Sequence, residues 1–108
     1  MERGEVWLAQ MPPPRGVRPV LLLSRSSGQP YRLNVTVAPI TRIARGAPTE
    51  IPVDQTDGLA VPSVVNAEDL ITIPKQQLIR RIAKLNDGKL TAVRQAVMYA
   101  LDFGQESG

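Results

Sequence analysis

The sequence predicts a mainly β fold, in which a small, mostly antiparallel barrel or open sheet is closed by a C-terminal helix. Three observations lead to this fold class. Apolar and polar residues alternate over 32–41, residues 20–23 are apolar without a break, and apolar residues recur every three or four positions over 90–101. We expect residues 1–108 to form one domain, because a chain of this length can bury roughly two thirds of its unfolded surface.

The first two strands are expected on either side of a proline-rich loop. EVWLAQ (5–10) alternates like a strand with two distinct faces. MPPPRG (11–16) is expected to be a stiff loop, because consecutive prolines fix φ and remove backbone donors. The loop leads to Arg18, which precedes Pro19 at the mouth of the apolar strand VLLL (20–23). Because a proline disfavours the α region for the residue before it, Arg18 is expected to be held extended at a defined place.

The next strands are expected to continue a meander. RLNVTVAPIT (32–41) gives the clearest strand pattern, and one of its faces is apolar. The residues on that face are Leu33, Val35 and Val37. After a break at ARGAP (44–48), TEIPV (49–53) is expected to be a short strand that Pro52 keeps at the edge of the sheet.

The C-terminal part predicts short strands followed by a helix. Residues 62–75 hold two short apolar stretches around an acidic corner, and residues 78–85 fit either a helix or a short strand. Asn86 or Asp87 can cap the final helix, and Gly104 offers a stop. The apolar positions of this helix are Leu90, Val93, Val97 and Leu101.

Composition restricts the chemistry that is open to the chain. It has no cysteine and no histidine, which removes disulfides, a thiolate nucleophile and an imidazole acid or base, and comes close to excluding a zinc site. Thirteen Lys and Arg against ten Asp and Glu give a net charge of +3, which suits a nucleic-acid binder but equally an ordinary solvated surface. No targeting segment or membrane-spanning run is recognisable, so a cytoplasmic protein is expected.

Several segments carry a family pattern in their order and spacing. They are RGEVWLAQ, RPVLLLS, VTVAPIT, LITIPKQQL and a final LxxVxxAVxxAL helix, and they run from Arg3 to about Phe103. Together they resemble the MazF/PemK-type toxins of bacterial toxin–antitoxin modules. The resemblance implies a small SH3-like barrel of the MazF/PemK/CcdB type with a helix packed on it, a symmetric homodimer and a cognate antitoxin partner.

The resemblance also implies an activity, that of an mRNA interferase. Such an endoribonuclease needs no metal or other cofactor and cuts single-stranded RNA at short specific sequences by attack of the 2′-hydroxyl, which inhibits translation and growth. The RNA class is mRNA, with tRNA and rRNA as alternatives. The cut sequence itself does not follow from the resemblance.

Roles for individual residues follow from matching positions. The family's catalytic arginine and threonine fall on Arg18 and Thr41. A guanidinium suits the first role, because its forked donors match two phosphate oxygens and it stays charged. The positions expected to hold RNA are Ser63, Glu68 and Asp69, together with the arginines near strand ends, Arg15, Arg25, Arg42 and Arg45.

Two departures from the pattern and three alternatives stay open. PPPRGVR lacks a carboxylate that many relatives carry, so the general base is unassigned, and Ile71 stands where relatives often have arginine. Taken without the family pattern, Arg18 is a solvated charge and Thr41 a residue with high β-propensity. The same fold also serves a non-enzymatic toxin that poisons DNA gyrase, and a plain SH3-like interaction module is the third possibility.

Overall fold

Seven strands and one α-helix make up the part of the chain that the structure, a computed structural model, describes, which is residues 1–24 and 33–102. Two short 3-10 helices, η1 and η2, join some of them. The elements are β1 (Glu5–Met11), β2 (Gly16–Leu22), β3 (Asn34–Thr41), β4 (Glu50–Val53), η1 (Gln55–Asp57), β5 (Ser63–Asn66), β6 (Ile71–Pro74), η2 (Lys75–Gln77), β7 (Leu78–Lys84) and α1 (Asp87–Leu101).

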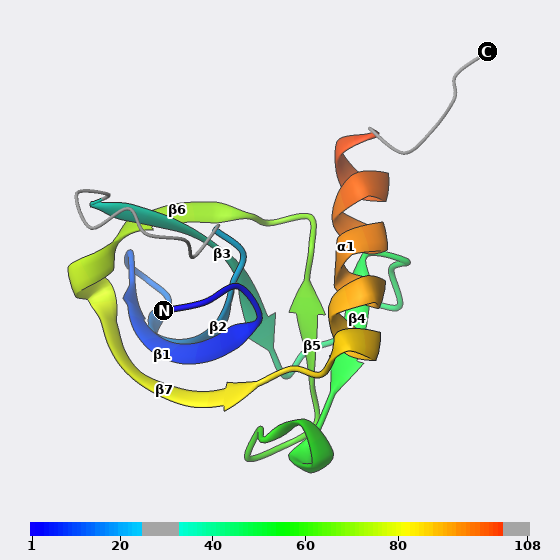
Figure 1. Ribbon diagram of the computed structural model, residues 1–108, viewed down its shortest axis with the longest axis horizontal. Coiled ribbons are helices and arrows are strands. Elements are labelled where there is room, and N and C mark those ends of the chain that lie inside the picture. The colour runs from blue at the N-terminus through cyan, green and yellow to red at the C-terminus, as the bar shows by residue number, and fades with distance from the viewer. Residues whose placement is uncertain (25–32, 103–108) are drawn as a thin grey trace.

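The strands form one antiparallel sheet in the order β4-β5-β3-β2-β1-β7, and β6 pairs with β3 outside this path. Figure 1 shows β1, β2, β3, β6 and β7 curling into a barrel-like half, with β4, β5 and α1 at the other end. The path ends at β4 and β7, so the sheet is curled but not closed. The predicted fold class, mainly antiparallel β with a C-terminal helix, is confirmed.

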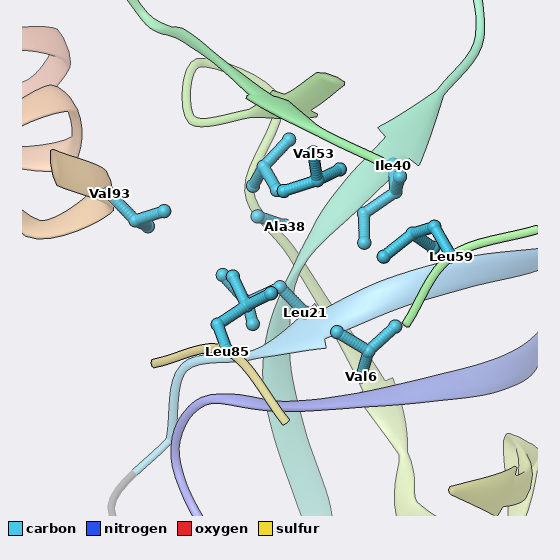
Figure 2. Packing of buried hydrophobic residues seen from close by; sticks show 9 residues of the cluster. Val6, Leu21, Ala38, Ile40, Val53, Leu59, Leu85 and Val93 are labelled. Carbon is cyan, nitrogen blue, oxygen red and sulfur yellow. The ribbon is translucent and has the colours of Figure 1, made fainter. Parts of the chain in front are cut away.

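The core consists of two apolar clusters that share the central strands. β2 explains the unbroken apolar run of the sequence, because Leu21 packs in the first cluster while Val20 and Leu22 pack in the second. Strand side chains alternate between faces, so a strand covered on both sides must be apolar throughout. Figure 2 shows the first cluster, in which Val93 of α1 faces the sheet.

β3 passes from one cluster to the other along its length. Val37 lies in the second cluster, whereas Ile40 lies in the first. The strand pairs with β2 and β6 over its first part and with β5 at its end, where Thr41 is opposite Val64. The prediction for Leu33 was wrong: it precedes the first paired residue, Asn34, and is 77% exposed.

The remaining predictions concern the edges of the fold. β4 is an edge strand that contains Pro52, as expected. The ambiguous segment 78–85 is a strand, because β7 covers the free edge of β1. Asn86 caps α1 by accepting a hydrogen bond from the Lys89 N–H at 2.8 Å, and Gly104 lies outside the described residues. Within the described ranges no helix is long and apolar enough to span a membrane.

Candidate functional site

A pocket of about 660 Å³ opens where β3 leaves β2 and joins β5. Its walls come from the β1–β2 hairpin and from the end of β3 with the segment that follows. Residues of β4, β5 and β7, the loop before β5 and the turn after β5 complete them. The charged residues that line it are Arg15, Arg18, Arg42, Arg45, Glu50 and Asp69. Residues distant in the sequence therefore meet in one place.

Arg18 is presented to the pocket by the β1–β2 ladder. It is the third residue of β2 and is opposite Ala9, while Pro19 is opposite Leu8. The sequence analysis expected a loop over residues 11–16 and Arg18 at the start of the following strand. The β1–β2 ladder instead begins at the Met11–Gly16 pair, so the loop is shorter than expected and Arg18 lies within the strand. Val17 and Pro19, the residues before and after Arg18, are also paired with β1, which fixes the backbone of Arg18. The side chain of Arg18 is exposed.

Thr41 ends β3 on another wall of the pocket. Its Oγ1 accepts a hydrogen bond from the Ile43 N–H at 3.2 Å. A hydroxyl has one donor and two acceptor positions, so this bond leaves the Thr41 O–H free to donate. Thr41 can thus donate to an anion in the pocket while the start of the next segment stays bound to it.

β5 and the turn after it supply further polar groups. Ser63 donates its hydroxyl to the Val61 carbonyl at 3.0 Å. Asn66 orders the acidic corner, because its Nδ2 donates to Asp69 Oδ2 at 3.0 Å and its Oδ1 accepts from the Glu68 N–H at 2.9 Å. Ser63, Asn66 and Asp69 line the pocket, whereas Glu68 does not.

Most of the charged residues that line the pocket had been predicted from the sequence as site residues, but not all of them. The structure brings together Arg15, Arg18, Thr41, Arg42, Arg45, Ser63 and Asp69, whereas Arg25 lies outside the described residues. Two polar residues of the lining were missed, Glu50 and Asn66. The signal for Asn66 was its place directly before the acidic corner, but no signal pointed to Glu50, because its partners are backbone groups.

The pocket has an excess of positive charge. Four arginines face two carboxylates in its lining. Over residues 1–24 and 33–102, none of these arginines lies within ion-pair distance of a carboxylate. Their charge is thus available to a bound polyanion such as a phosphate backbone. The same ranges hold no group of three or more His, Cys, Asp or Glu residues that could bind a metal ion.

A curled antiparallel sheet with one C-terminal helix and an arginine-lined pocket defines the class, a small β protein with a positively charged pocket. The family model described as the PemK-like, MazF-like toxin of type II toxin–antitoxin systems matches residues 2–101. The chain belongs to this family. The family resemblance stated from the sequence is confirmed.

Individual relatives agree with this assignment. Endoribonuclease MazF3 of Mycobacterium tuberculosis is 46% identical over 85 residues, which cover 79% of this chain and 82% of the relative. The solved structure of Mycobacterium tuberculosis toxin MazF-mt6 is 42% identical, with a TM-score of 0.83 over 91% of this chain and 96% of that one.

A more distant structure shows the same fold. It is an endoribonuclease in complex with its cognate antitoxin from a mycobacterial species. It is 22% identical, with a TM-score of 0.81 over 94% of this chain and 95% of that one. The 46% identical relative is an endoribonuclease, which favours RNA cleavage over the gyrase-poisoning alternative.

Proposed function

We propose that this chain is the toxin of a type II toxin–antitoxin system and a metal-independent endoribonuclease that cleaves single-stranded RNA, with mRNA as its main substrate. The observation that carries the proposal is that Arg18 and Thr41, which lie on different strands, line one pocket together with Arg15, Arg42 and Arg45. Family membership and the endoribonuclease relatives support the same conclusion.

The proposed reaction is attack by the RNA 2′-hydroxyl on the adjacent phosphorus. The new bond to the 2′-oxygen forms as the bond to the 5′-oxygen breaks, and negative charge gathers on the phosphoryl oxygens. Arg18 stabilises that charge with its forked donors, and Thr41 donates its free O–H to the same group. The departing 5′-oxygen takes up a proton from water, so the products are a 2′,3′-cyclic phosphate and a 5′-hydroxyl.

Asp69 is our candidate for the acceptor of the 2′-hydroxyl proton. The two carboxylates of the pocket differ in their engagement. Both oxygens of Glu50 accept hydrogen bonds from backbone N–H groups, whereas Asp69 is bonded only through Oδ2, by Asn66. One oxygen of Asp69 therefore remains open to receive a proton from a substrate.

RNA cleavage in a chelator tests the proposal. The purified chain is incubated with single-stranded RNA of mixed sequence in excess EDTA, and the product ends are identified by enzymatic end-labelling and mass spectrometry. We expect cleavage with 2′,3′-cyclic phosphate and 5′-hydroxyl ends. A strict requirement for an added divalent metal, or ends with a 5′-phosphate, would contradict the mechanism.

Assembly is the second part of the proposal. We propose a two-fold homodimer that binds a cognate antitoxin in the cytoplasm, where mRNA is translated. Family membership supports this assembly, and so does the end of α1. There Tyr99 and Leu101 expose about half of their surface, which leaves apolar side chains that a second subunit could cover. Sedimentation should show a dimer at micromolar concentration, and a fully active monomer would count against it.

A further inference from the structure

Glu50 lines the pocket with both carboxylate oxygens held by backbone. Its Oε1 accepts hydrogen bonds from the N–H groups of Arg45 at 2.9 Å, Gly46 at 2.8 Å and Ala47 at 3.1 Å. Its Oε2 accepts a second contact from Arg45 at 3.1 Å. Three successive N–H groups thus converge on one carboxylate, which is the geometry of an anion-binding nest.

The nest depends on the backbone of Gly46. This residue has a φ of 77°, in the left-handed region that glycine adopts without a steric penalty. A β-carbon at this position would meet no atom within 4 Å, so a substitution would act on the backbone conformation and not on packing. A substitution of Gly46 should therefore disturb the nest without changing the charge of Glu50.

The segment that Glu50 holds carries two of the pocket's arginines. Residues 42–47 belong to no strand or helix, and Arg42 and Arg45 line the pocket from this stretch. In the described part of the chain, the other hydrogen bonds of this stretch are local. The Ile43 N–H donates to Thr41 Oγ1, and the Glu50 N–H donates to the Ala47 carbonyl. The Glu50 carboxylate is thus its principal anchor.

Asn66, the residue opposite Glu50 in the sheet, also orders a neighbouring segment of the pocket. Glu50 is paired with Asn66 across β4 and β5, and Asn66 is the residue that orders Glu68 and Asp69. One register position of the β4–β5 ladder therefore anchors both the basic segment and the acidic corner. The ladder transmits a fixed geometry to two walls of the same pocket.

We propose that Glu50 is a positioning residue for RNA binding, which holds segment 42–47 so that Arg42 and Arg45 contact the phosphate backbone. This inference rests on the proposed RNA-cleaving function. Glu50 acts through the two arginines, because its oxygens accept hydrogen bonds from the backbone of the segment that carries them. Thr41 is held separately by its pairing with Val64, so binding should suffer more than chemistry.

The test compares Glu50→Ala with the wild-type protein. Binding of a non-cleavable, mixed-sequence 2′-O-methyl RNA is measured as a function of salt, and KM and kcat are measured on cleavable RNA. We expect Glu50→Ala to raise Kd and KM about tenfold, to lower the log–log salt slope by about one to two units, and to change kcat less than about threefold. Glu50→Gln keeps one acceptor oxygen and should recover part of the binding. Glu2→Ala, which removes an exposed carboxylate outside the pocket, is the matched control and should bind like wild type.

A mutant cycle separates positioning from general destabilisation. If Glu50 acts through the arginines, adding Glu50→Ala to the Arg42→Ala/Arg45→Ala double variant should cost little further affinity. Gly46→Ala should weaken RNA binding in the same direction as Glu50→Ala, with the charge of the pocket unchanged. A further tenfold loss in the triple variant, or wild-type affinity in a folded Glu50→Ala protein, would overturn the inference.

Amide hydrogen exchange gives a readout that does not depend on RNA. In Glu50→Ala the amides of Arg45, Gly46 and Ala47 should exchange faster, while those of β2 and β3 should not change. Unchanged exchange at the three amides would also overturn the inference. If the wild-type chain neither binds nor cleaves RNA, the proposed function fails and this inference falls with it. If wild type binds and Glu50→Ala binds equally, only the inference fails.

Discussion

Replacing Arg18 should abolish most of the RNA cleavage while leaving the fold intact. The Arg18 side chain is exposed and has no carboxylate partner in the described part of the chain, and only its backbone takes part in the β1–β2 ladder. Arg18→Ala therefore leaves no buried group unpaired, and its effect on unfolding should stay within about 0.5 kcal/mol.

The catalytic loss is set by the transition state. Removing one preorganised donor to developing negative charge costs about 2.7–4 kcal/mol, so the cleavage rate should fall on the order of 10²- to 10³-fold. Arg18→Lys should restore little of it, because an ammonium is a point charge and cannot make two parallel bonds to a phosphate. The loss should appear in kcat as well as in kcat/KM, since the contact strengthens as charge develops.

The assay is single-turnover cleavage of one RNA at saturating enzyme in EDTA, with thermal unfolding measured on the same samples. Arg80→Ala is the matched control, because Arg80 is also an exposed arginine on a strand but lies outside the pocket. A folded Arg18→Ala protein that cleaves at a near-normal rate, or an equal loss in Arg80→Ala, would return Arg18 to the role of a solvated charge.

Three further predictions concern binding and stability. Arg15→Ala should weaken RNA binding and reduce the log–log salt slope by about one unit, with the rate at saturating RNA little changed; loss of turnover with binding intact would make Arg15 catalytic. Burial raises the pKa of Glu5, but hydrogen bonds from the Trp7 indole and the Glu2 backbone, with nearby positive charge, lower it below its ordinary 4.5 overall. The stability that the Glu5 carboxylate contributes should thus be present above pH 4.5 and disappear as the pH falls through the lowered pKa. Urea unfolding followed by Trp7 fluorescence should therefore show Glu5→Gln to be less stable than wild type at pH 7 and nearly equal to it at low pH. Val93→Ala should cost about 2 kcal/mol of unfolding free energy by denaturant titration, because Val93 is 1% exposed in the first core cluster, whereas exposed Thr91→Ala should cost under about 0.5.

The predictable parts of the fold are those set by local side-chain chemistry. The apolar run around Leu21 is a strand covered on both faces, and Pro52 marks an edge strand because it cannot donate in the middle of a sheet. Segment 78–85 could not be decided locally. Its apolar spacing suits a helix, and it became a strand because β1 offered a free edge to pair with, which is a tertiary effect.

The candidate site divides in the same way. Arg18 and Thr41 were found because the family pattern marks their positions, and the structure brings them to one pocket. Glu50 escaped notice because its partners are main-chain N–H groups, which have no signature in the side chains. The role of Glu68 as an RNA contact is the weaker of the predictions at the acidic corner, since the neighbouring Asp69 lines the pocket and Glu68 does not.

The pairing of β1 with β7 has a consequence for how the protein is made. Leu8 and Ile82 both line the pocket, and they come from strands near the two ends of the described chain. A nascent chain emerging from the ribosome therefore carries Arg18 and Thr41 long before it carries the strand that completes the pocket wall. The pocket therefore lacks the part of its wall that Ile82 supplies until β7 has been translated.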